Sequence, residues 1–321
     1  MNRLVLIDGN AILHRAYHAL PPLTAPDGTL VNAVYGFTSM LFKIFHDLAP
    51  SHIAVAFDRP KPTFRKKLFA EYQATRPKMD EELAGQIDKV HEVVRAFGIP
   101  IFEKDGFEAD DIIGTLSHSA NHTLHIDQTI IVTGDRDILQ LVNDRAFVYM
   151  PTKGLSEAKL YMEKEVKEKL GVEPRFIADY KGLAGDSSDN YPGVSGIGPK
   201  TAVSLIETFG TIENLYKALK KKDKKLGKFS PSVLEKLTNG QESAVLSKTL
   251  ATIHCHVKLD ESLESAAITT LNTPKAQKIL GDLHFHSLLK RLNPGENDSD
   301  SNKEHNVKKE QRKIDEQQQL F

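Results

Sequence analysis

The segment TIIVTGD, at residues 129–135, is a nearly continuous apolar run that ends in an aspartate. Three further runs have the same character: RLVLID (3–8), HIAVAFD (52–58) and IPIFE (99–103). Strands that are buried on both faces of a parallel sheet have this composition. Longer amphipathic stretches separate the runs and predict helices at 33–47, 82–97 and 109–120. The sequence therefore predicts an α/β protein with a parallel sheet.

Acidic residues recur where these predicted strands end. Asp8, Asp58 and Asp135 close three of the four runs, and the carboxyl ends of parallel strands form the ligand crevice in open α/β sheets. Six more acids lie in DGFEADDIIG (105–114), TGDRD (133–137) and GDSSDN (185–190), namely Glu108, Asp110, Asp111, Asp137, Asp186 and Asp189. Two like charges about 4 Å apart repel by roughly 4 kcal/mol at an effective dielectric of about 20. Nine carboxylates in one crevice therefore require cations.

The ligand chemistry of this crevice favours particular cations. Oxygen ligands without a nearby histidine or cysteine favour Mg²⁺, for which Mn²⁺ can substitute, over zinc. Two or more such ions would stabilise the attacking and leaving oxygens of a phosphoryl transfer or hydrolysis. The alternative is that single acids cap helices, as Asp110 or Asp111 would at a helix start. The recurrence of acids at strand ends favours metal binding over capping.

Composition limits the protein class. The 321 residues are 40% hydrophobic and 26% charged, which suffices for one large or two moderate globular domains. The single cysteine, Cys255, excludes an internal disulfide, and no apolar run approaches the roughly 18 residues that would span a membrane. The N-terminal MNRLVLIDGN does not resemble a signal peptide. A monomer in the bacterial cytoplasm without membrane contact is expected.

The net charge of −1 hides a segregation of charge. Residues 59–78 hold seven Lys or Arg against one acid, and 217–228 hold seven lysines. In the first segment the cations lie beside Phe69 and Tyr72, which is typical of proteins that contact backbone phosphates and stack on bases. These cations are Arg65, Lys66, Lys67, Arg76 and Lys78. A solvated basic helix face, or for 217–228 a solvated loop, is the alternative.

A glycine-rich segment, PGVSGIGPKTA, occupies residues 192–202. It does not match the Gly-Lys-Ser/Thr of a Walker loop, because Pro199 separates Gly198 from Lys200. ATP binding is therefore not expected. A Gly-x-Gly turn that leads into a helix instead offers backbone N–H groups to a phosphate, so Gly196, Gly198, Lys200 and Thr201 are expected to bind duplex backbone without reading bases.

Five segments together resemble a known family: LIDGNAILHRAYHAL (6–20), VAFDRPKPTFRKKLF (55–69), GFEADDIIGTL (106–116), TGDRDILQLV (133–142) and GDSSDNYPGVSGIGPKTA (185–202). They are similar to the 5′-nucleases, which include flap endonucleases and the 5′→3′ exonuclease domain of bacterial DNA polymerase I. The resemblance covers about 1–290. It implies a PIN-like α/β nuclease core over 1–175 with a helical arch near 60–85. A helix-three-turn-helix DNA-binding domain over 176–292 would follow. Independently of the resemblance, the polar composition of 293–321 predicts a disordered tail.

The resemblance also implies an activity and its residues. All nine acids match metal-binding positions of the family, and Tyr72 and Arg76 match positions near the scissile phosphate. Many relatives have a lysine where this chain has Gln73, so Arg76 or Arg15 would carry more of the phosphate polarisation, with Lys67 as a further arch cation. The implied activity is metal-dependent 5′→3′ exonuclease and 5′-flap endonuclease cleavage of DNA at flaps, nicks and 5′ ends during replication and repair. K⁺ is implied at the 192–198 turn.

Two other functions share part of this pattern. A PIN-type ribonuclease would need the carboxylates but not the 192–202 turn or the arch. A paralogue that binds DNA structures without turnover would need the turn and the arch but not the full set of acids. No polymerase segment is visible in the sequence.

The residues QQQLF, at 317–321, resemble the pentapeptide by which many bacterial replication and repair proteins bind the sliding clamp. Leu320 and Phe321 form the only adjacent pair of large apolar residues in an otherwise polar tail, and a disordered segment gains nothing by exposing such a pair without a pocket to receive it. Because the tail is glutamine-rich, Gln317 can also match by chance. Clamp binding through Gln317, Leu320 and Phe321 is the expectation.

Overall fold

A six-stranded sheet forms the centre of the molecule in the computed structural model, which describes residues 2–153 and 157–292. The strands are β1 (Arg3–Asp8), β2 (His52–Ala56), β3 (Ile101–Phe102), β4 (Gln128–Val132), β5 (Ala146–Lys153) and β6 (Glu157–Tyr161), in the order β3-β2-β1-β4-β5-β6. Strands β1 to β5 are parallel, and β6 is antiparallel to β5. The strand order reverses between β1 and β4, and such a switch point is where open α/β sheets bind ligands.

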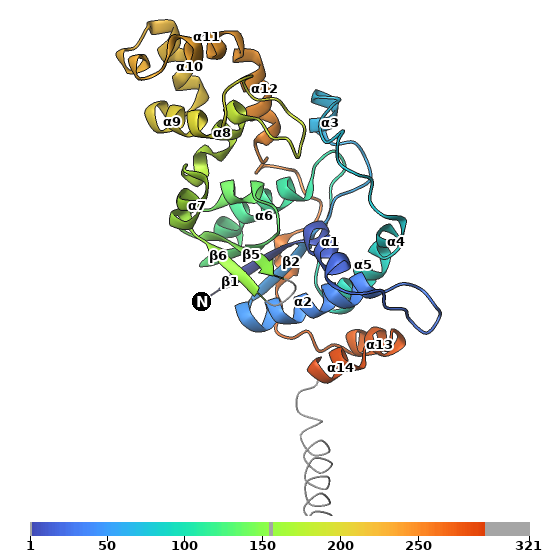
Figure 1. The fold of residues 1–321 in the computed structure, drawn as a ribbon. Coiled ribbons are helices and arrows are strands. Elements are labelled where there is room, and N and C mark those ends of the chain that lie inside the picture. The colour runs from blue at the N-terminus through green and yellow to red at the C-terminus, as the bar shows by residue number, and fades with distance from the viewer. Residues whose placement is uncertain (1, 154–156, 293–321) are drawn as a thin grey trace, which may run out of the picture.

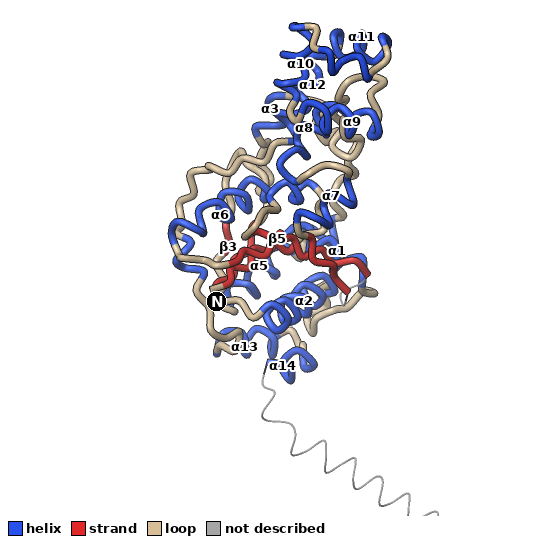
Figure 2. Tube along the Cα trace, turned by 90° about the vertical axis from the view of Figure 1, so that its left-hand side faces the viewer, coloured by secondary structure: helices blue, strands red, loops and turns tan. Residues whose placement is uncertain are grey.

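Helices cover both faces of the sheet (Figures 1 and 2). Because strand side chains alternate, Val5 and Ile7 of β1 point to one layer while Leu4 and Leu6 point to the other. The first layer contains α1 (Gly9–Ala19), α2 (Asn32–Leu48), α5 (Ile87–Ala96), α13 (Pro274–Asp282) and α14 (His286–Leu292). The second contains α6 (Ala109–Thr123), which packs Ile112, Ile113 and Leu116 against the sheet. Two-sided burial explains why the strands read as continuous apolar runs.

A helical domain stands at one end of this core, at the top of Figure 1. It follows α7 (Glu163–Leu170) and contains α8 (Ile177–Ala184), α9 (Pro199–Phe209), α10 (Ile212–Lys221), α11 (Pro231–Asn239) and α12 (Gln241–Ala251). Helices α8 and α12 pack together, and their apolar side chains join the core layer of α6. The sequence-based expectation of an α/β core with a separate helical part is confirmed.

The basic segment between β2 and α5 leaves the core as an irregular excursion. It contains the short helices α3 (Phe64–Leu68) and α4 (Glu81–Ala84), joined by turns. The single helix expected at 82–97 is divided between α4 and α5 because Gln86 turns inward. Its Oε1 accepts hydrogen bonds from the N–H of Ala33 (2.9 Å) and Val34 (3.3 Å), which satisfies the start of α2.

Residues that follow the helical domain return to the core. The expectation that 176–292 forms one helical DNA-binding unit therefore does not hold for the part after Ile253. Ile268 N–H donates to Ser51 O at 3.0 Å, and Thr273 Oγ donates to Ala96 O at 2.6 Å. Helices α13 and α14 then add Leu280 and Leu288 to the first layer, which also contains α1, α2 and α5. Strands β5 and β6 were not expected from the sequence. The tail at 293–321, with its QQQLF, lies outside the described residues.

Candidate active site

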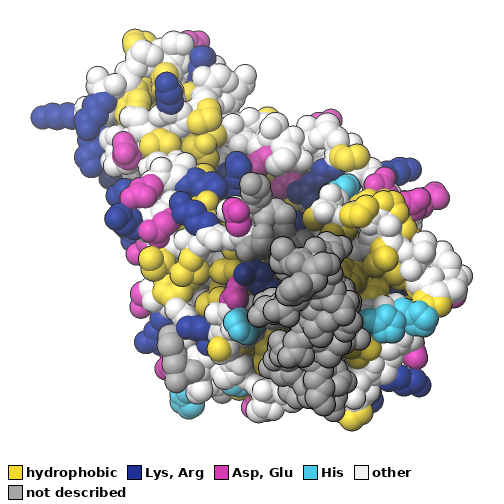
Figure 3. All heavy atoms as spheres, turned by 60° about the horizontal axis from the view of Figure 1, so that its bottom comes forward, with side chains coloured by type: hydrophobic (Ala, Val, Ile, Leu, Met, Phe, Trp, Pro, Cys, Tyr) yellow, Lys and Arg dark blue, Asp and Glu magenta, His cyan; other side chains and the backbone are white. Residues whose placement is uncertain are grey.

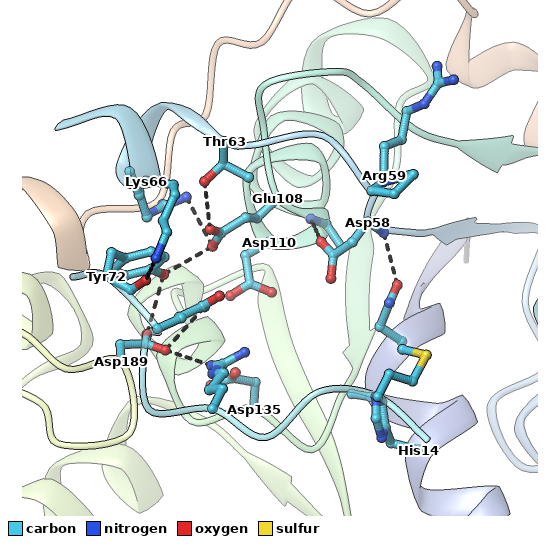
Figure 4. Close-up of a pocket in the computed structure, with 18 of the residues that line it drawn as sticks. His14, Asp58, Arg59, Thr63, Lys66, Tyr72, Glu108, Asp110, Asp135 and Asp189 are labelled. Carbon is cyan, nitrogen blue, oxygen red and sulfur yellow. Dashed lines mark hydrogen bonds and ion pairs between the residues drawn. The ribbon is translucent and has the colours of Figure 1, made fainter. Parts of the chain in front are cut away.

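A cleft of about 850 Å³ opens at the carboxyl edge of the sheet, between the core and the 58–80 segment (Figure 4). Asp8 ends β1 and also caps α1, because its Oδ1 accepts from Ala11 N–H at 3.0 Å while its Oδ2 accepts from Thr133 Oγ at 2.6 Å. Gly9 begins α1, and a Cβ at this position would lie 2.4 Å from the Phe57 ring. A glycine after Asp8 therefore allows the helix to begin directly above Phe57.

Among the other acids that line the same cleft as Asp8 are Asp58, Glu108, Asp110 and Asp135. Asp58 is held by Ala109 N–H, which donates to its Oδ1 at 2.7 Å, and Asp135 Oδ1 accepts from Asp137 N–H at 2.8 Å. Asp110 has no hydrogen bond or ion pair with any described residue. These five acids are called the first acidic group below. Its members come from four separate segments, and backbone N–H groups fix the direction of the Asp8, Asp58 and Asp135 carboxylates.

The first acidic group has little compensating positive charge: of its five members only Glu108 has an ion pair with a described residue, at 3.2 Å from Arg65 Nη1. Burial raises the pKa of Asp8 to about 7, and the neighbouring carboxylates of Asp58 and Asp135 add to the shift. Burial likewise raises the pKa of Glu108 to about 7 despite the nearby Arg65 guanidinium. The pKa of Asp110 is raised well above its usual value, first by burial and then by Asp135 and Asp8. Such a site has high affinity for protons or for cations.

Asp137, Asp186 and Asp189 form a second acidic group, whose ligand oxygens lie within 4.8 Å of one another. Here the protein supplies its own cations. The Lys181 ammonium on α8 donates to both Asp137 and Asp186, and Arg76 Nη2 donates to Asp189 Oδ1 at 2.6 Å. Although burial raises the pKa of Asp186, hydrogen bonds from Lys181 and Ser188 lower it below its usual value.

Asp111 and Arg65 do not have the roles expected from the sequence. The Asp111 side chain is fully buried, and its oxygens accept from Arg65 Nη1 (2.7 Å), Arg65 Nη2 (2.8 Å) and the N–H groups of His254 and Glu108. No lone pair remains for a metal. Arg65 is 2% exposed and also donates to Leu250 O and Thr252 O, so its guanidinium is held by protein groups. The Asp111–Arg65 pair instead links α6, the 58–80 segment that corresponds to the expected arch, and the end of α12.

The arch residues Tyr72 and Gln73 contact the acidic groups directly. Tyr72 is 3% exposed, and its hydroxyl donates to Glu108 Oε2 at 3.2 Å. Burial and the nearby carboxylates of Glu108 and Asp189 raise the pKa of Tyr72, which keeps it a proton donor. Gln73 adopts a left-handed backbone conformation (φ 54°). Its backbone N–H donates to the backbone O of Asp189 (2.9 Å) and its Nε2 to the carboxylate Oδ1 of Asp189 (3.2 Å).

Some of the other predicted residues line the cleft and others do not. Arg76 and Lys78 line the cleft, whereas Arg15 and Lys67 are not among its lining residues. Among the lining residues that the sequence reasoning did not single out are Asn10, His14 and His18. They follow one another at intervals of four along α1, so helical spacing within the stretch after the first aspartate would have found them. Burial lowers the pKa of His14, with His18 and Arg76 adding to the effect, so its imidazole is neutral.

The 192–198 turn leads directly into α9, with Gly198 at the N-cap and Pro199 as the first helical residue. Gly196 has a φ of +76° and is exposed, as is Lys200, while Thr201 is half-buried. Lys236 Nζ donates to Gly196 O at 3.4 Å. The lysines of 217–228 are all exposed, on α10 and in the following 3₁₀ turn. Lys and Arg side chains gather along the outer edge of this domain at the upper left of Figure 3.

An acid-lined cleft at the carboxyl edge of a parallel sheet, with an arch above it and a helical domain beside it, defines a nuclease of the 5′-nuclease class. The chain belongs to the 5′-3′ exonuclease family. The "5'-3' exonuclease, N-terminal resolvase-like domain" matches residues 3–171, and the "5'-3' exonuclease, C-terminal SAM fold" matches residues 172–274.

Relatives and solved structures agree with this assignment. The chain is 42% identical over 293 residues to DNA polymerase I of Caldicellulosiruptor bescii and 40% identical over 290 residues to that of Bacillus subtilis. Each match covers 90% of this chain but 33% and 32% of the relative, so the chain spans about a third of their length.

Two solved structures share the fold. The T5 D15 protein co-crystallized with metal ions has a TM-score of 0.66 at 19% identity and covers 88% of this chain and 99% of that one. The catalytic core of Rad2 in complex with DNA substrate has a TM-score of 0.61 at 18% identity, covering 91% and 92%. Among the described residues, no helix combines the length and apolar character needed to cross a membrane.

Proposed function

We propose that this protein is a divalent-metal-dependent 5′→3′ exonuclease and 5′-flap endonuclease that hydrolyses DNA phosphodiesters in Okazaki fragment processing and repair. The observation that carries the proposal is Asp110, which lies half-buried in the cleft with the other four acids of the first acidic group and has no hydrogen bond or ion pair to the described residues. An uncompensated buried carboxylate is costly unless a cation joins it. A binding protein without turnover would have no need for it.

The donor set fits Mg²⁺, with Mn²⁺ as a substitute, because it offers only carboxylate oxygens at the centre of the cleft. The first acidic group would hold one ion, and Asp137, Asp186 and Asp189 a second. Bound there, the ions would supply Lewis-acid activation of water and charge stabilisation on the leaving oxygen. Asp111 is not part of this set, because Arg65 occupies both of its oxygens.

Protein groups at the mouth of the cleft have complementary roles. Arg76 is half-exposed and lines the cleft, so its planar guanidinium can turn from Asp189 to the oxygens of a phosphate. Lys66 and Lys78 also line the cleft and attract a single-stranded backbone. The Tyr72 hydroxyl orients Glu108, and neutral His14 can exchange protons at the opposite wall.

Duplex DNA would lie along the helical domain. The start of α9 offers the N–H groups of the Gly196–Gly198 turn together with Lys200, which suits a backbone phosphate. The lysines of 217–228 would extend this surface. K⁺ at the turn would have to displace Lys236 from Gly196 O. We also propose a cytoplasmic monomer that binds the sliding clamp through Gln317, Leu320 and Phe321.

The test of the proposed function is Asp110→Asn. We expect the flap-cleavage rate in Mg²⁺ to fall by orders of magnitude, because the substitution removes a charged ligand, while DNA affinity in Ca²⁺ stays unchanged. Asp144→Asn, at an exposed turn remote from the cleft, is the matched control and should cleave normally. Single-stranded RNA serves as the competing substrate. Near-normal cleavage by Asp110→Asn, or faster cleavage of RNA than of flaps, would contradict the proposal.

A further inference from the structure

The two acidic groups differ in one respect that bears on how the site is loaded. The first group has no lysine contact, and Asp110 in particular has no partner among the described residues. In the second group the ammonium of Lys181 lies between Asp137 and Asp186, at hydrogen-bonding distance from both. The Lys181 ammonium thus occupies the position at which the carboxylate oxygens of Asp137 and Asp186 would otherwise bind a metal ion.

Lys181 is fixed in this position by its helix. Residues Ile177, Gly182 and Leu183 of α8 are buried, and α8 packs against α12. The side chain of Lys181 is 13% exposed, so its ammonium is largely removed from water and depends on the two carboxylates for compensation. Arg76, in contrast, reaches Asp189 from the exposed arch with 48% of its side chain accessible. Of these two cations, Lys181 is the one built into the domain framework.

We propose that Lys181 is a resident counter-cation of the second acidic group, which a divalent ion must displace from Asp137 and Asp186 before it can bind there. This inference rests on the proposed metal-dependent function. The physical reason is that a +1 charge at the ligand oxygens both occupies their lone pairs and repels an incoming +2 charge. The first group therefore loads first, and the second loads at higher metal concentration.

The arrangement also explains how the metal-free protein tolerates the second group. Three carboxylates within 4.8 Å would repel one another strongly, and Lys181 and Arg76 neutralise most of that charge. Lys181 is thus a positioning residue. It keeps the ligands converged without metal and lowers the affinity of the second site for metal.

The experiment measures metal binding without DNA and without turnover. Mn²⁺ is titrated into the full-length wild-type protein and Lys181→Met, and free Mn²⁺ is read from its electron paramagnetic resonance signal. Wild type should show a tight and a weak class of site. In Lys181→Met the weak class should tighten by at least about tenfold, because the competing charge is gone, and the metal-free variant should melt at a lower temperature.

Lys248→Met is the matched control. Lys248 is also a half-buried lysine between two acids of the helical domain, with Asp179 at 2.6 Å and Glu213 at 2.8 Å, but neither acid lines the cleft. Its Mn²⁺ binding should equal that of wild type. Lys181→Gln provides a second neutral variant if the methionine does not fold, as judged by circular dichroism.

Each result has a defined meaning. An unchanged or weakened second class in folded Lys181→Met or Lys181→Gln overturns the inference while leaving the proposed function intact. Tightening in Lys248→Met as well would also overturn it, since the effect would then follow from net charge alone. Absence of any Mn²⁺ binding by wild type overturns the proposed metal-dependent function together with this inference.

Discussion

Replacing Asp8 with asparagine should stabilise the metal-free protein at neutral and higher pH. The Asp8→Asn side chain would keep the shape of the original and can still accept from Ala11 N–H, so the cap of α1 survives. The substitution removes a buried charge, and with it the Oδ2 that accepts from Thr133 Oγ. Burial raises the pKa of Asp8 from 3.8 to about 7, and at 1.36 kcal/mol per unit this corresponds to about 4 kcal/mol in the free energy of unfolding.

The sign follows from linkage. The folded-state pKa of Asp8 lies above its unfolded value, so its protonated form stabilises the fold at low pH, and that stability is lost as the pH rises from about 4 through 7. The gain from Asp8→Asn should therefore be about 4 kcal/mol near pH 8 and only about 2 kcal/mol near pH 5.

The assay is urea unfolding in EDTA at both pH values, followed by circular dichroism. Asp144→Asn, at an exposed turn, is the control and should unfold like wild type. Adding Mg²⁺ should reverse the order at pH 8, because wild type alone keeps the full ligand set. A metal-free Asp8→Asn protein that is less stable than wild type at pH 8 would refute the electrostatic argument and leave Asp8 as a helix cap.

Three further predictions concern the arch, the duplex surface and the tail. Arg65→Met should lower the free energy of unfolding by about 3–5 kcal/mol, because it leaves Asp111 as an uncompensated buried charge, and Arg65→Met combined with Asp111→Leu should recover part of the loss. Lys200→Ala should weaken duplex binding and reduce its salt dependence by about one phosphate contact, while the single-turnover cleavage rate stays unchanged. Arg76→Ala should slow the single-turnover cleavage rate, while duplex affinity stays nearly unchanged. If both variants lose the same step, the division of roles between Lys200 and Arg76 is contradicted. Calorimetric titration of a sliding clamp with protein lacking 317–321 should show no binding, and equal affinity with and without these residues would disprove the clamp contact.

Much of the nuclease core could be predicted because its elements are local. Continuous apolar runs identify β1, β2 and β4, and the acids that follow them fix the edge of the sheet that binds ligands. Strand β6 could not be seen this way, because it is a mostly exposed edge strand without an apolar run. Strand β5 does contain the apolar stretch AFVYM and was missed although this signal was present. The break between α4 and α5 could not be predicted either, because it depends on the hydrogen bond between Gln86 and the start of α2, which is far away in the sequence.

The acids could be found from the sequence, but their roles could not be separated. Asp110 and Asp111 are neighbours with the same side chain, yet one points into the cleft and the other is enclosed by Arg65 and the backbone of His254. Successive residues of a helix point about 100° apart, so only the packing of α12 and the arch decides which aspartate is free. Lys181 was missed for the same reason, because its partner Asp137 lies 44 positions away.

The return of residues 253–292 to the core makes the helical domain an insertion rather than an appendage. The chain crosses between the two bodies twice, once near Pro174–Phe176 and once near Thr252, where Arg65 also holds the backbone. Two connections, together with the apolar layer that α8 and α12 share with α6, leave the helical domain less rotational freedom than a single flexible linker would. A duplex held by α9 would therefore keep its rotational phase relative to the carboxylates, so the phosphate offered to the cleft is set by counting nucleotides along a fixed path.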